Sequence, residues 1–486
     1  MSGTFHVHTF GCQMNVHDSD RMSELLRAHG WNEADQEAAD VIVLNTCSVR
    51  EKAEQKLRSE LGRLAAMKRT KRDLVLVVAG CVAQQEGDRL LSREPALDLV
   101  IGPDNIEELP ALLEHARAGG PPKTHAIFDT DEPRFLAAKP ERGRTPVSAF
   151  VTTMKGCDER CSFCIVPYTR GPERYRRADE IVEECKRFVA AGAREIVLLG
   201  QTVDSFRDDA LPPPDSSDPD ESQFPHLLRR IANEVPELLR LRYTSPHPRH
   251  ATPSLARAHA ELDVLARHVH LPVQSGSDAV LRRMIRRYTR AEYIERANRL
   301  KSARPALTMS TDIIVGFPGE TDEQFEETLS LVREVGFVSL FAFKYSPRPY
   351  TPALKLKGEL PEDVKDARLA ALLALGNAQT EAHLASLVGT QQRVLVTGRS
   401  RTNSRLTVGG AAPDTPDPHA ASLRSATFEG RTEANEIVHI TGSPEVGALV
   451  EVEVTERFKH SLAARMTSTF AAAPPKTKAP VHLPIL

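Results

Sequence analysis

The chain has 486 residues, of which 41% are hydrophobic and 27% are charged, with a formal net charge of −3 at pH 7. This composition is ordinary for a globular protein and excludes a chain that is basic overall, so a nucleic acid would have to bind local patches. The length predicts about three domains. No run approaches the roughly 20 apolar residues of a membrane helix, and the N-terminus lacks a secretory signal pattern. We therefore expect a cytoplasmic protein that does not contact membranes.

The first predicted domain covers residues 1–120. Residues 41–44 and 74–79 are continuous apolar runs, typical of strands buried in a parallel sheet. A charged stretch between them, residues 49–67, is predicted as a helix. These elements indicate a parallel α/β domain, followed by a polar connector that runs to about residue 145.

The second predicted domain covers residues 143–385 and continues the alternation of strands and helices. Six strands are expected, at residues 148–154, 195–199, 239–244, 268–271, 308–315 and 338–344. Six parallel βα units favour a partial (β/α)6 barrel, similar to an opened TIM barrel, over a doubly wound sheet. Residues 208–222 are rich in Pro, Asp and Ser, which predicts a disordered surface loop.

The third predicted domain covers residues 386–466. Short apolar strands with glycine turns, at residues 393–398, 436–440 and 448–454, predict a small all-β barrel. A loop at residues 399–427 interrupts this barrel. Residues 467–486 are predicted to be a disordered tail.

Three of the seven cysteines, Cys157, Cys161 and Cys164, form a C-x3-C-x2-C loop just after a predicted strand. A cubane of four irons needs four protein thiolates, so a loop with three leaves one iron open to an outside ligand. A zinc site is the alternative, but no fourth Cys or His follows within the loop. Coincidence is remote for three cysteines so close together. The spacing therefore predicts a reactive iron–sulfur cluster.

A second set of three cysteines is spread along the first domain. Cys12, Cys47 and Cys81 each stand just past the carboxyl end of a predicted strand. Those ends meet at one edge of a parallel sheet, so we expect the three thiols to converge and to hold a second cluster. The alternative is three buried thiols with no ligand. Cys185 differs, because it lies at core spacing in a predicted helix, and we interpret it as a core residue.

Two further features have plain alternatives. Arg283, Arg286 and Arg287 would share one face of a short helix over residues 277–287, which is either an RNA-binding patch or a solvated face. His247 and His250 lie in a proline-rich segment, and two histidines three apart are only a faint metal signal. A surface loop is the better interpretation of that segment.

The motifs TFGCQMN (residues 9–15), CIVPYTRG (164–171), LGQTVDSF (199–206) and HLPVQSGS (270–277), with the C-x3-C-x2-C loop, resemble those of radical S-adenosylmethionine methylthiotransferases. The residues of these motifs are most similar to those of one branch, the tRNA 2-methylthio-N6-dimethylallyladenosine synthases. The resemblance covers about residues 3–466. It implies an N-terminal methylthiotransferase domain, a radical S-adenosylmethionine core and a C-terminal RNA-binding β barrel called TRAM. Tyr350 departs from the pattern, because Gly usually follows the run Ser346-Pro347-Arg348-Pro349 in that family.

The resemblance also implies an activity: methylthiolation of C2 of N6-(dimethylallyl)adenosine next to the anticodon of tRNA. Cys157, Cys161 and Cys164 would hold the [4Fe-4S] cluster that cleaves S-adenosylmethionine to a radical. Cys12, Cys47 and Cys81 would hold an auxiliary [4Fe-4S] cluster that delivers sulfur, and two S-adenosylmethionine molecules would be used per turnover. By strand-end position, contacts to S-adenosylmethionine are assigned to Gln201, Gln274 and Gly316.

The expected partners are tRNA carrying isopentenylated adenosine, an electron donor and a sulfur source, and we expect a monomer. Two alternative functions stay open at this point. One is the same chemistry on a ribosomal protein side chain. The other is a non-catalytic iron–sulfur protein that binds RNA, although such carriers normally saturate all four irons with protein ligands.

Overall fold

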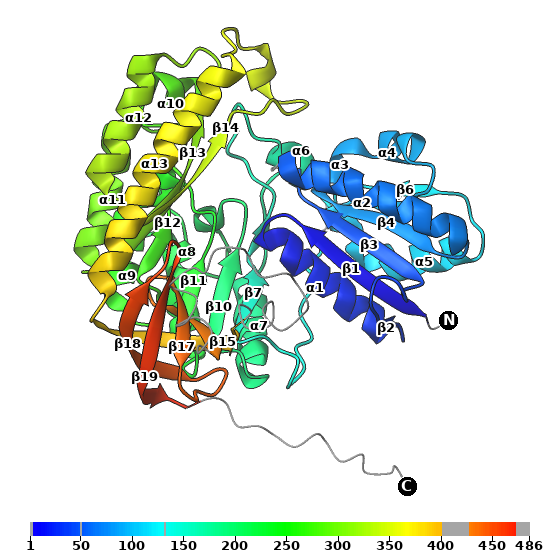
Figure 1. Ribbon diagram of the computed structural model, residues 1–486, viewed down its shortest axis with the longest axis horizontal. Helices are drawn as coiled ribbons and strands as arrows, with labels where there is room; N and C mark the ends of the chain where they lie inside the picture. Colours follow the sequence, from blue (N-terminus) through cyan, green and yellow to red (C-terminus); the bar gives the residue numbers. More distant parts are fainter. Residues whose placement is uncertain (1–2, 49–50, 131–132, 401–426, 473–486) are drawn as a thin grey trace, which may run out of the picture.

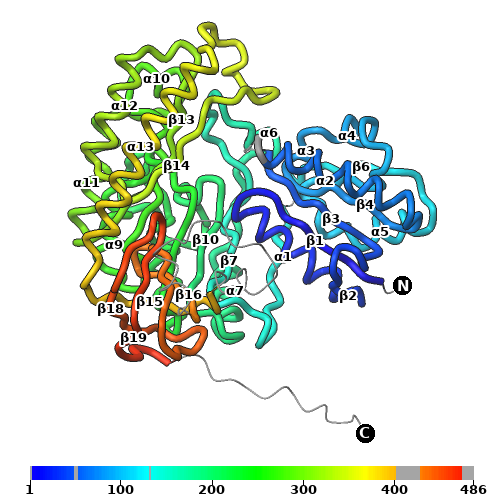
Figure 2. Tube along the Cα trace, in the orientation of Figure 1, coloured from blue at the N-terminus to red at the C-terminus, as the bar shows by residue number. Residues whose placement is uncertain are grey.

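The computed structural model describes residues 3–48, 51–130, 133–400 and 427–472. Figure 1 shows an N-terminal α/β unit on one side, a larger α/β core beside it, and a small β barrel against the lower part of the core. The segment between residues 125 and 148 leads from the N-terminal unit into the core, and the tube in Figure 2 shows α6 (Val166–Arg170) of the core beside α3 (Cys81–Glu86) of the N-terminal unit. No helix among the described residues combines the length and the apolar character needed to cross a membrane.

The N-terminal unit is built on one parallel sheet of six strands in the order β2-β1-β3-β4-β5-β6. The domain boundary predicted at residue 120 precedes β6, which pairs with β5 and completes this sheet. Its strands are β1 (Thr4–Phe10), β2 (Asn32–Glu33), β3 (Val41–Thr46), β4 (Val75–Gly80), β5 (Leu99–Ile101) and β6 (Lys123–His125). Its helices are α1 (Gln13–Ala28), α2 (Glu51–Thr70), α3 (Cys81–Glu86), α4 (Asp88–Arg93), η1 (Pro103–Glu108) and α5 (Leu109–Arg117).

Helices cover both faces of this sheet, which explains the continuous apolar runs of β3 and β4. Val41 and Val43 face α1 and α5, whereas Ile42 and Leu44 face α2, α3 and α4. All four side chains are at most 1% exposed. Because successive side chains of a strand point to opposite faces, a strand buried on both faces must be apolar at every position.

Six strands of the core pair in parallel and form two sheets of three, in the orders β11-β10-β7 and β12-β13-β14. A parallel bridge between Leu241 and Leu265 joins β11 to the segment before β12. The predicted partial barrel is therefore confirmed, with all six strands in the predicted positions. They are β7 (Ser148–Thr152), β10 (Glu195–Leu199), β11 (Arg240–Tyr243), β12 (His268–His270), β13 (Thr308–Val315) and β14 (Ser339–Lys344).

The core helices pack on the outside of these sheets (Figure 1). Thr289 and Glu292 form a capping box at the start of α11, and Thr321 and Gln324 form another at α12. Cys185 lies fully buried in α7, which confirms its interpretation as a core residue. The helices are α7 (Ala178–Ala190), α8 (Phe224–Glu234), α9 (Pro253–Glu261), α10 (Asp278–Met284), α11 (Arg290–Ala303), α12 (Asp322–Val335) and α13 (Glu362–Leu387).

The C-terminal unit is a closed barrel in the order β15-β16-β17-β19-β18, as predicted. Residues 467–471, predicted as part of a disordered tail, instead continue β19 and pair with β18. Most of the predicted loop at 399–427, and the tail from residue 473, lie outside the described residues. The strands are β15 (Gln391–Arg399), β16 (Phe428–Thr432), β17 (Ile437–Thr441), β18 (Leu449–Arg457) and β19 (Ser461–Ala471).

Buried charges join the barrel to the core. Glu195 of β10 accepts hydrogen bonds from Arg242 (2.8 Å) and Arg240 (3.4 Å) of β11. The same two guanidinium groups reach the backbone carbonyls of Arg431 (3.1 Å) and Thr432 (2.9 Å) in the barrel. Glu195 therefore holds in place the two arginines that bind the barrel.

The loop at residues 208–222 was predicted to be disordered, and this is wrong. Asp220 pairs with Arg296 at 3.1 Å, and Asp215 accepts hydrogen bonds from Ser254 (2.5 Å) and Arg257 (2.7 Å). The acidic side chains that predicted solvation of this loop instead find basic and hydroxyl partners on the core.

Candidate cluster-binding sites

Cys12, Cys47 and Cys81, the N-terminal cysteine set, follow β1, β3 and β4, three strands that are neighbours in the sheet. Cys12 is the N-cap residue of α1, and Cys81 is the first residue of α3. The structure thus brings the three residues to one sheet edge, as expected from the strand-end rule.

Contacts among these thiols confirm that they converge. A side-chain hydrogen bond with Cys47 lowers the pKa of the Cys12 thiol to about 6, against the effect of burial. Burial raises the pKa of Cys81, and the nearby Cys12 adds to this rise. Each thiol therefore senses another member of the set, which is the grouping that a shared cluster requires.

The backbone around the set is shaped to let the cysteines approach. Gly11 has φ +150°, and a Cβ there would lie 2.5 Å from the Cβ of Cys47. Gly80 has φ +90°, and a Cβ there would lie 2.8 Å from the carbonyl oxygen of Thr46. Thr46 and Ser48, on either side of Cys47, carry buried hydroxyl groups without a hydrogen-bond partner. Unpartnered polar atoms around a thiol fit a site that takes a further group.

Cys157, Cys161 and Cys164, the core cysteine set, lie in the loop between β8 (Met154–Lys155) and α6. The loop is held by backbone hydrogen bonds from Cys157 N to Gly171 O (3.1 Å) and from Cys164 N to Cys161 O (3.1 Å). Ser162 is fixed from outside the loop, because its N–H donates to Met284 O at 2.9 Å and its carbonyl accepts from Ala353 N at 2.8 Å.

The thiols of the core set are buried close enough to interact. Burial raises the pKa of Cys157, and Cys164 and Cys161 raise it further. Burial and Cys161 raise the pKa of Cys164 to about 12. Buried thiolates that lie close together repel one another, so a positively charged iron centre that binds them would stabilise their ionised form. The donor set therefore fits an iron–sulfur cluster.

Two side chains from other segments of the α/β core contact these sulfurs. Thr202, after β10, places its Oγ1 3.0 Å from the Sγ of Cys157. Arg286 donates from Nη1 to the Sγ of Cys161 at 3.3 Å. Among the described residues, no three His, Cys, Asp or Glu side chains surround the position of a single metal ion. A cubane spreads its thiolates over different irons, so it does not require that arrangement.

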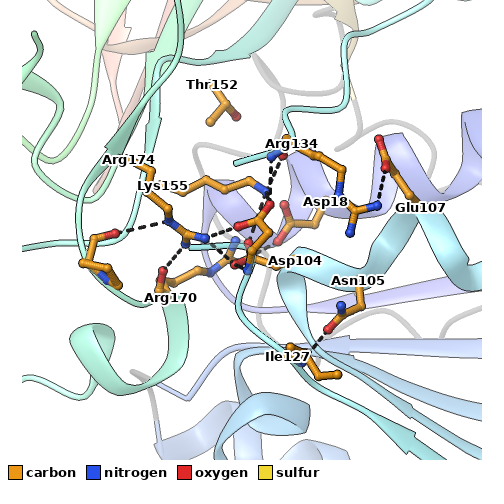
Figure 3. A network of polar contacts seen from close by, with 12 residues as sticks. Asp18, Asp104, Asn105, Glu107, Ile127, Arg134, Thr152, Lys155, Arg170 and Arg174 are labelled. Atoms are coloured by element: carbon orange, nitrogen blue, oxygen red, sulfur yellow. Dashed lines mark hydrogen bonds and ion pairs between the residues drawn. The ribbon is translucent and has the colours of Figure 1, made fainter. Parts of the chain in front are cut away.

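A buried ionic interface joins the N-terminal unit to the segments on either side of the core cysteine loop (Figure 3). Arg170, at the end of α6, donates to the Sγ of Cys81 (3.3 Å) and to Asp18 of α1 (2.6 Å). Arg174 pairs with Asp104 at 2.7 Å, and Lys155 pairs with Asp104 at 3.1 Å. Despite burial, the charge of Lys155 lowers the pKa of Asp104 to about 2. The interface therefore stays charged and fixes the N-terminal unit against the core loop.

The three residues assigned to S-adenosylmethionine lie after strands of the core. Gln201 follows β10, and both polar atoms of its amide are buried without a hydrogen-bond partner. Gln274 follows β12 with φ +73°, and its backbone N–H donates to Asp312 O at 2.9 Å. Gly316 follows β13 with φ +70°, and its N–H donates to Glu320 at 2.7 Å. The orphaned amide of Gln201 makes it the best placed of the three to meet a ligand.

Residues that the sequence interpretation missed lie beside the core set. His247 and His250 were predicted in a surface loop, and this is wrong, because they are only 5% and 7% exposed. The backbone N–H of His247 donates to Asp204 Oδ1 at 2.8 Å. Asp204 Oδ2, His247 Nε2 and Glu159 Oε2 are all buried without a hydrogen-bond partner, and the last two lie 4.0 Å apart. The signal in the sequence was the position of His247 in the segment that follows β11, at the end of a core strand.

The arginine patch also differs from the prediction. α10 ends at Met284, and Ile285 adopts a left-handed conformation that turns the chain. Arg286 therefore points inward and is buried against Cys161 and Tyr288, while Arg283 donates to Gln324. The three arginines do not share a helix face, and Arg286 contacts the core cysteine loop instead.

Two protein-family models match this chain. Residues 4–102 match the model of "Uncharacterized protein family UPF0004", and residues 151–332 match the radical SAM superfamily. The tRNA-2-methylthio-N(6)-dimethylallyladenosine synthase of Sorangium cellulosum is 60% identical over 96% of this chain and 94% of its own length. The enzyme of the same name from Acidithiobacillus ferrooxidans is 42% identical over 95% of this chain and 96% of its own length. The chain belongs to the family of the tRNA-2-methylthio-N(6)-dimethylallyladenosine synthases.

Solved structures agree on the fold. The radical S-adenosylmethionine methyltransferase TsrM from Kitasatospora setae, with tryptophan and an S-adenosylmethionine analogue bound, superposes with a TM-score of 0.53. It is 14% identical and covers 72% of this chain and 75% of its own. At this sequence identity, the similarity shows that the two proteins share a fold, and it does not extend to function.

Proposed function

We propose that this protein methylthiolates C2 of N6-(dimethylallyl)adenosine next to the anticodon of tRNA, giving 2-methylthio-N6-(dimethylallyl)adenosine. The observation that carries the proposal is the pair of three-cysteine sets, with Arg170, shortly after the core set, donating to Cys81 of the N-terminal set across a buried interface. Family membership over nearly the whole chain supports this substrate.

The core cysteine set would hold a [4Fe-4S] cluster with one open iron, and the N-terminal set would hold an auxiliary [4Fe-4S] cluster. When bound, the two clusters and S-adenosylmethionine supply one-electron cleavage of the sulfonium, hydrogen abstraction, and transfer of sulfur and methyl. An adenine C–H bond needs such chemistry, because no protein acid or base can activate it.

The chain's own residues would bind and orient these groups. Arg286 and Thr202 contact the sulfurs of the core set and fix their positions. Gln201, Gln274 and Gly316 are proposed to contact S-adenosylmethionine at the strand ends. The side-chain amide of Gln201, His247 Nε2 and Asp204 Oδ2 have no hydrogen-bond partner within the protein, so they offer both donors and acceptors to a polar ligand.

The further partners also belong to the proposal. The substrate is tRNA carrying isopentenylated adenosine, and the closed C-terminal barrel is a TRAM-like RNA-binding unit fixed to the core through Arg240 and Arg242. The reaction also needs an electron donor and a sulfur source, and we expect the protein to work as a cytoplasmic monomer.

Nucleoside analysis of tRNA tests the proposal. A strain without this gene should accumulate N6-(dimethylallyl)adenosine and lack its 2-methylthio derivative. The wild-type gene and a Cys185→Ala variant should restore the product, whereas Cys157→Ala and Cys12→Ala should not. Methylthiolated adenosine that persists in the deletion strain would refute the tRNA assignment. Loss of a methylthio group from a ribosomal protein in that strain would favour the alternative substrate.

A further inference from the structure

Two exposed tyrosine rings lie together beside the core cysteine loop. Tyr168 in α6 is 40% exposed, and Tyr350, after β14, is 53% exposed. Their ring centroids are 6.0 Å apart, with 35° between the ring planes. Large aromatic side chains gain free energy by burial, so a paired set of open ring faces marks a surface that meets a partner.

The backbone of Tyr350 adds an independent observation. Tyr350 has φ +69°, a left-handed conformation in which an L side chain is disfavoured and glycine is favoured. A bulky side chain in this conformation carries local strain, and strained residues of this kind gather at functional sites. The exposed ring makes only the contact with Tyr168 among the ring pairs of the described residues.

The ring pair is rigidly connected to the site of chemistry. Tyr168 lies in the helix that directly follows Cys164. The segment after Tyr350 is anchored by the hydrogen bond from Ala353 N to Ser162 O (2.8 Å), within the cysteine loop itself. Ala353 also belongs to a small apolar cluster with Phe317 and Tyr345. A group stacked on these rings would therefore be held at a fixed position relative to the loop.

The first two charged side chains that follow Tyr350 in the sequence are positive. Lys355 and Lys357, shortly after Tyr350, are exposed. Neither forms an ion pair with an acidic side chain in the part of the chain that the structure describes. Arg348 on the other side of Tyr350 is buried and pairs with Glu54 of the N-terminal unit at 2.9 Å. Open aromatic faces with unpaired cations match single-stranded nucleic acid, whose bases stack while its phosphates attract lysine.

We propose that Tyr168 and Tyr350 form a stacking site for an unpaired base of the RNA loop that presents the reacting adenosine. This inference rests on the proposed function, since it takes the substrate to be tRNA. Stacking a neighbouring base on a platform anchored to the cysteine loop would set how far the target adenosine reaches into the partial barrel of the core.

The test measures binding of a synthetic anticodon stem-loop RNA with isopentenylated adenosine to the full-length, cluster-loaded protein. Fluorescence anisotropy gives the dissociation constant for wild type, Tyr350→Gly, Tyr350→Phe and the surface control Leu373→Ala. Glycine suits the left-handed backbone, so Tyr350→Gly should melt no lower than wild type. We expect Tyr350→Gly to weaken RNA binding roughly 5- to 100-fold, with Tyr350→Phe and Leu373→Ala within about twofold of wild type.

A double-mutant cycle identifies the stacked base. The same RNA is made with an abasic site at each loop position in turn. At one position, the abasic site should weaken binding to wild type but cause little further loss in Tyr350→Gly. Equal RNA affinity of Tyr350→Gly and wild type, or additive losses at every position, would overturn the inference. Normal RNA affinity with slower cluster reduction by a protein electron donor would also overturn it, by assigning the rings to a protein partner.

The two proposals fail separately in this experiment. Product formation by wild type from the same RNA is measured in parallel. If the binding losses occur but wild type gives no methylthiolated product, the proposed function fails while the stacking site is supported.

Discussion

Arg170 donates a hydrogen bond from Nε to the sulfur of Cys81, 3.3 Å away. The donor belongs to the helix that follows the core cysteine loop, and the acceptor belongs to the N-terminal cysteine set. The same guanidinium pairs with Asp18 at 2.6 Å, and both side chains are less than 10% exposed. One buried cation therefore contacts both a carboxylate of the domain interface and Cys81, a proposed cluster ligand.

Replacing Arg170 with Leu should destabilise the protein strongly. The change leaves Asp18 buried without its main positive partner, and breaking a buried ion pair on one side costs about 3–5 kcal/mol. Urea unfolding of the protein without clusters should show this loss in the free energy of unfolding. Arg27→Gln is the matched control, since Arg27 and Glu33 form an exposed pair whose loss costs less than about 1 kcal/mol. Equal stability of the two variants would contradict this interpretation of the interface.

The convergence of the N-terminal cysteine set could be predicted because it depends on topology alone. Cys12, Cys47 and Cys81 each follow a strand, and parallel strands end at a common edge whatever their order in the sheet. The six core strands could also be predicted, because segments typical of strands and of helices alternate along residues 148–344. Local capping was equally readable, as the pair Thr289 and Glu292 shows.

Features that depend on long-range contacts could not be read from the sequence. His247 is buried because Asp204 and Tyr288, from other segments, surround its loop. Arg286 leaves the predicted helix because Ile285 turns the chain, and its partner Cys161 is far away in sequence. Polarity and proline predict a surface only when no such partner exists, and partners of this kind carry no local sequence signal.

Iron analysis should separate the two cysteine sets. Anaerobically reconstituted wild type should hold about eight irons, and the triple Ala variant at Cys12, Cys47 and Cys81 about four. The triple Ala variant at Cys157, Cys161 and Cys164 should also hold about four and should lose cleavage of S-adenosylmethionine. Cys185→Ala should retain the full content, because that thiol is buried in α7. Full iron content in either triple variant would show that its cysteines are not cluster ligands.

Glu195 should make stability depend on pH. Burial alone would raise its pKa, but Arg242 and Arg240 outweigh this and lower it below the ordinary value. Its stabilising effect is therefore fully present above about pH 4.5 and is lost as the pH falls through the lower pKa of the folded state.

The free energy of unfolding is measured for wild type and Glu195→Gln from about pH 3 to about pH 7. Glu195→Gln should be less stable by about 3 kcal/mol at pH 7, and the difference should shrink as the solution is acidified. Glu33→Gln, at an exposed pair, should differ from wild type by less than about 1 kcal/mol. A difference for Glu195→Gln that does not change with pH would exclude its ionisation as the cause.

Gln201 should contribute to binding of S-adenosylmethionine without affecting the clusters. Both polar atoms of its amide are buried and unpaired, so a ligand that bonds them gains two hydrogen bonds and relieves two unsatisfied groups. We expect Gln201→Ala to weaken equilibrium binding of S-adenosylmethionine to the reconstituted protein roughly 5- to 100-fold, with unchanged iron content. Gln379→Ala is the control, because Gln379 donates to Val332 O at 2.9 Å from the outer helix α13. If both variants bind S-adenosylmethionine as wild type does, Gln201 does not face this ligand, and its unpaired amide must serve the adenosine substrate or a bound water.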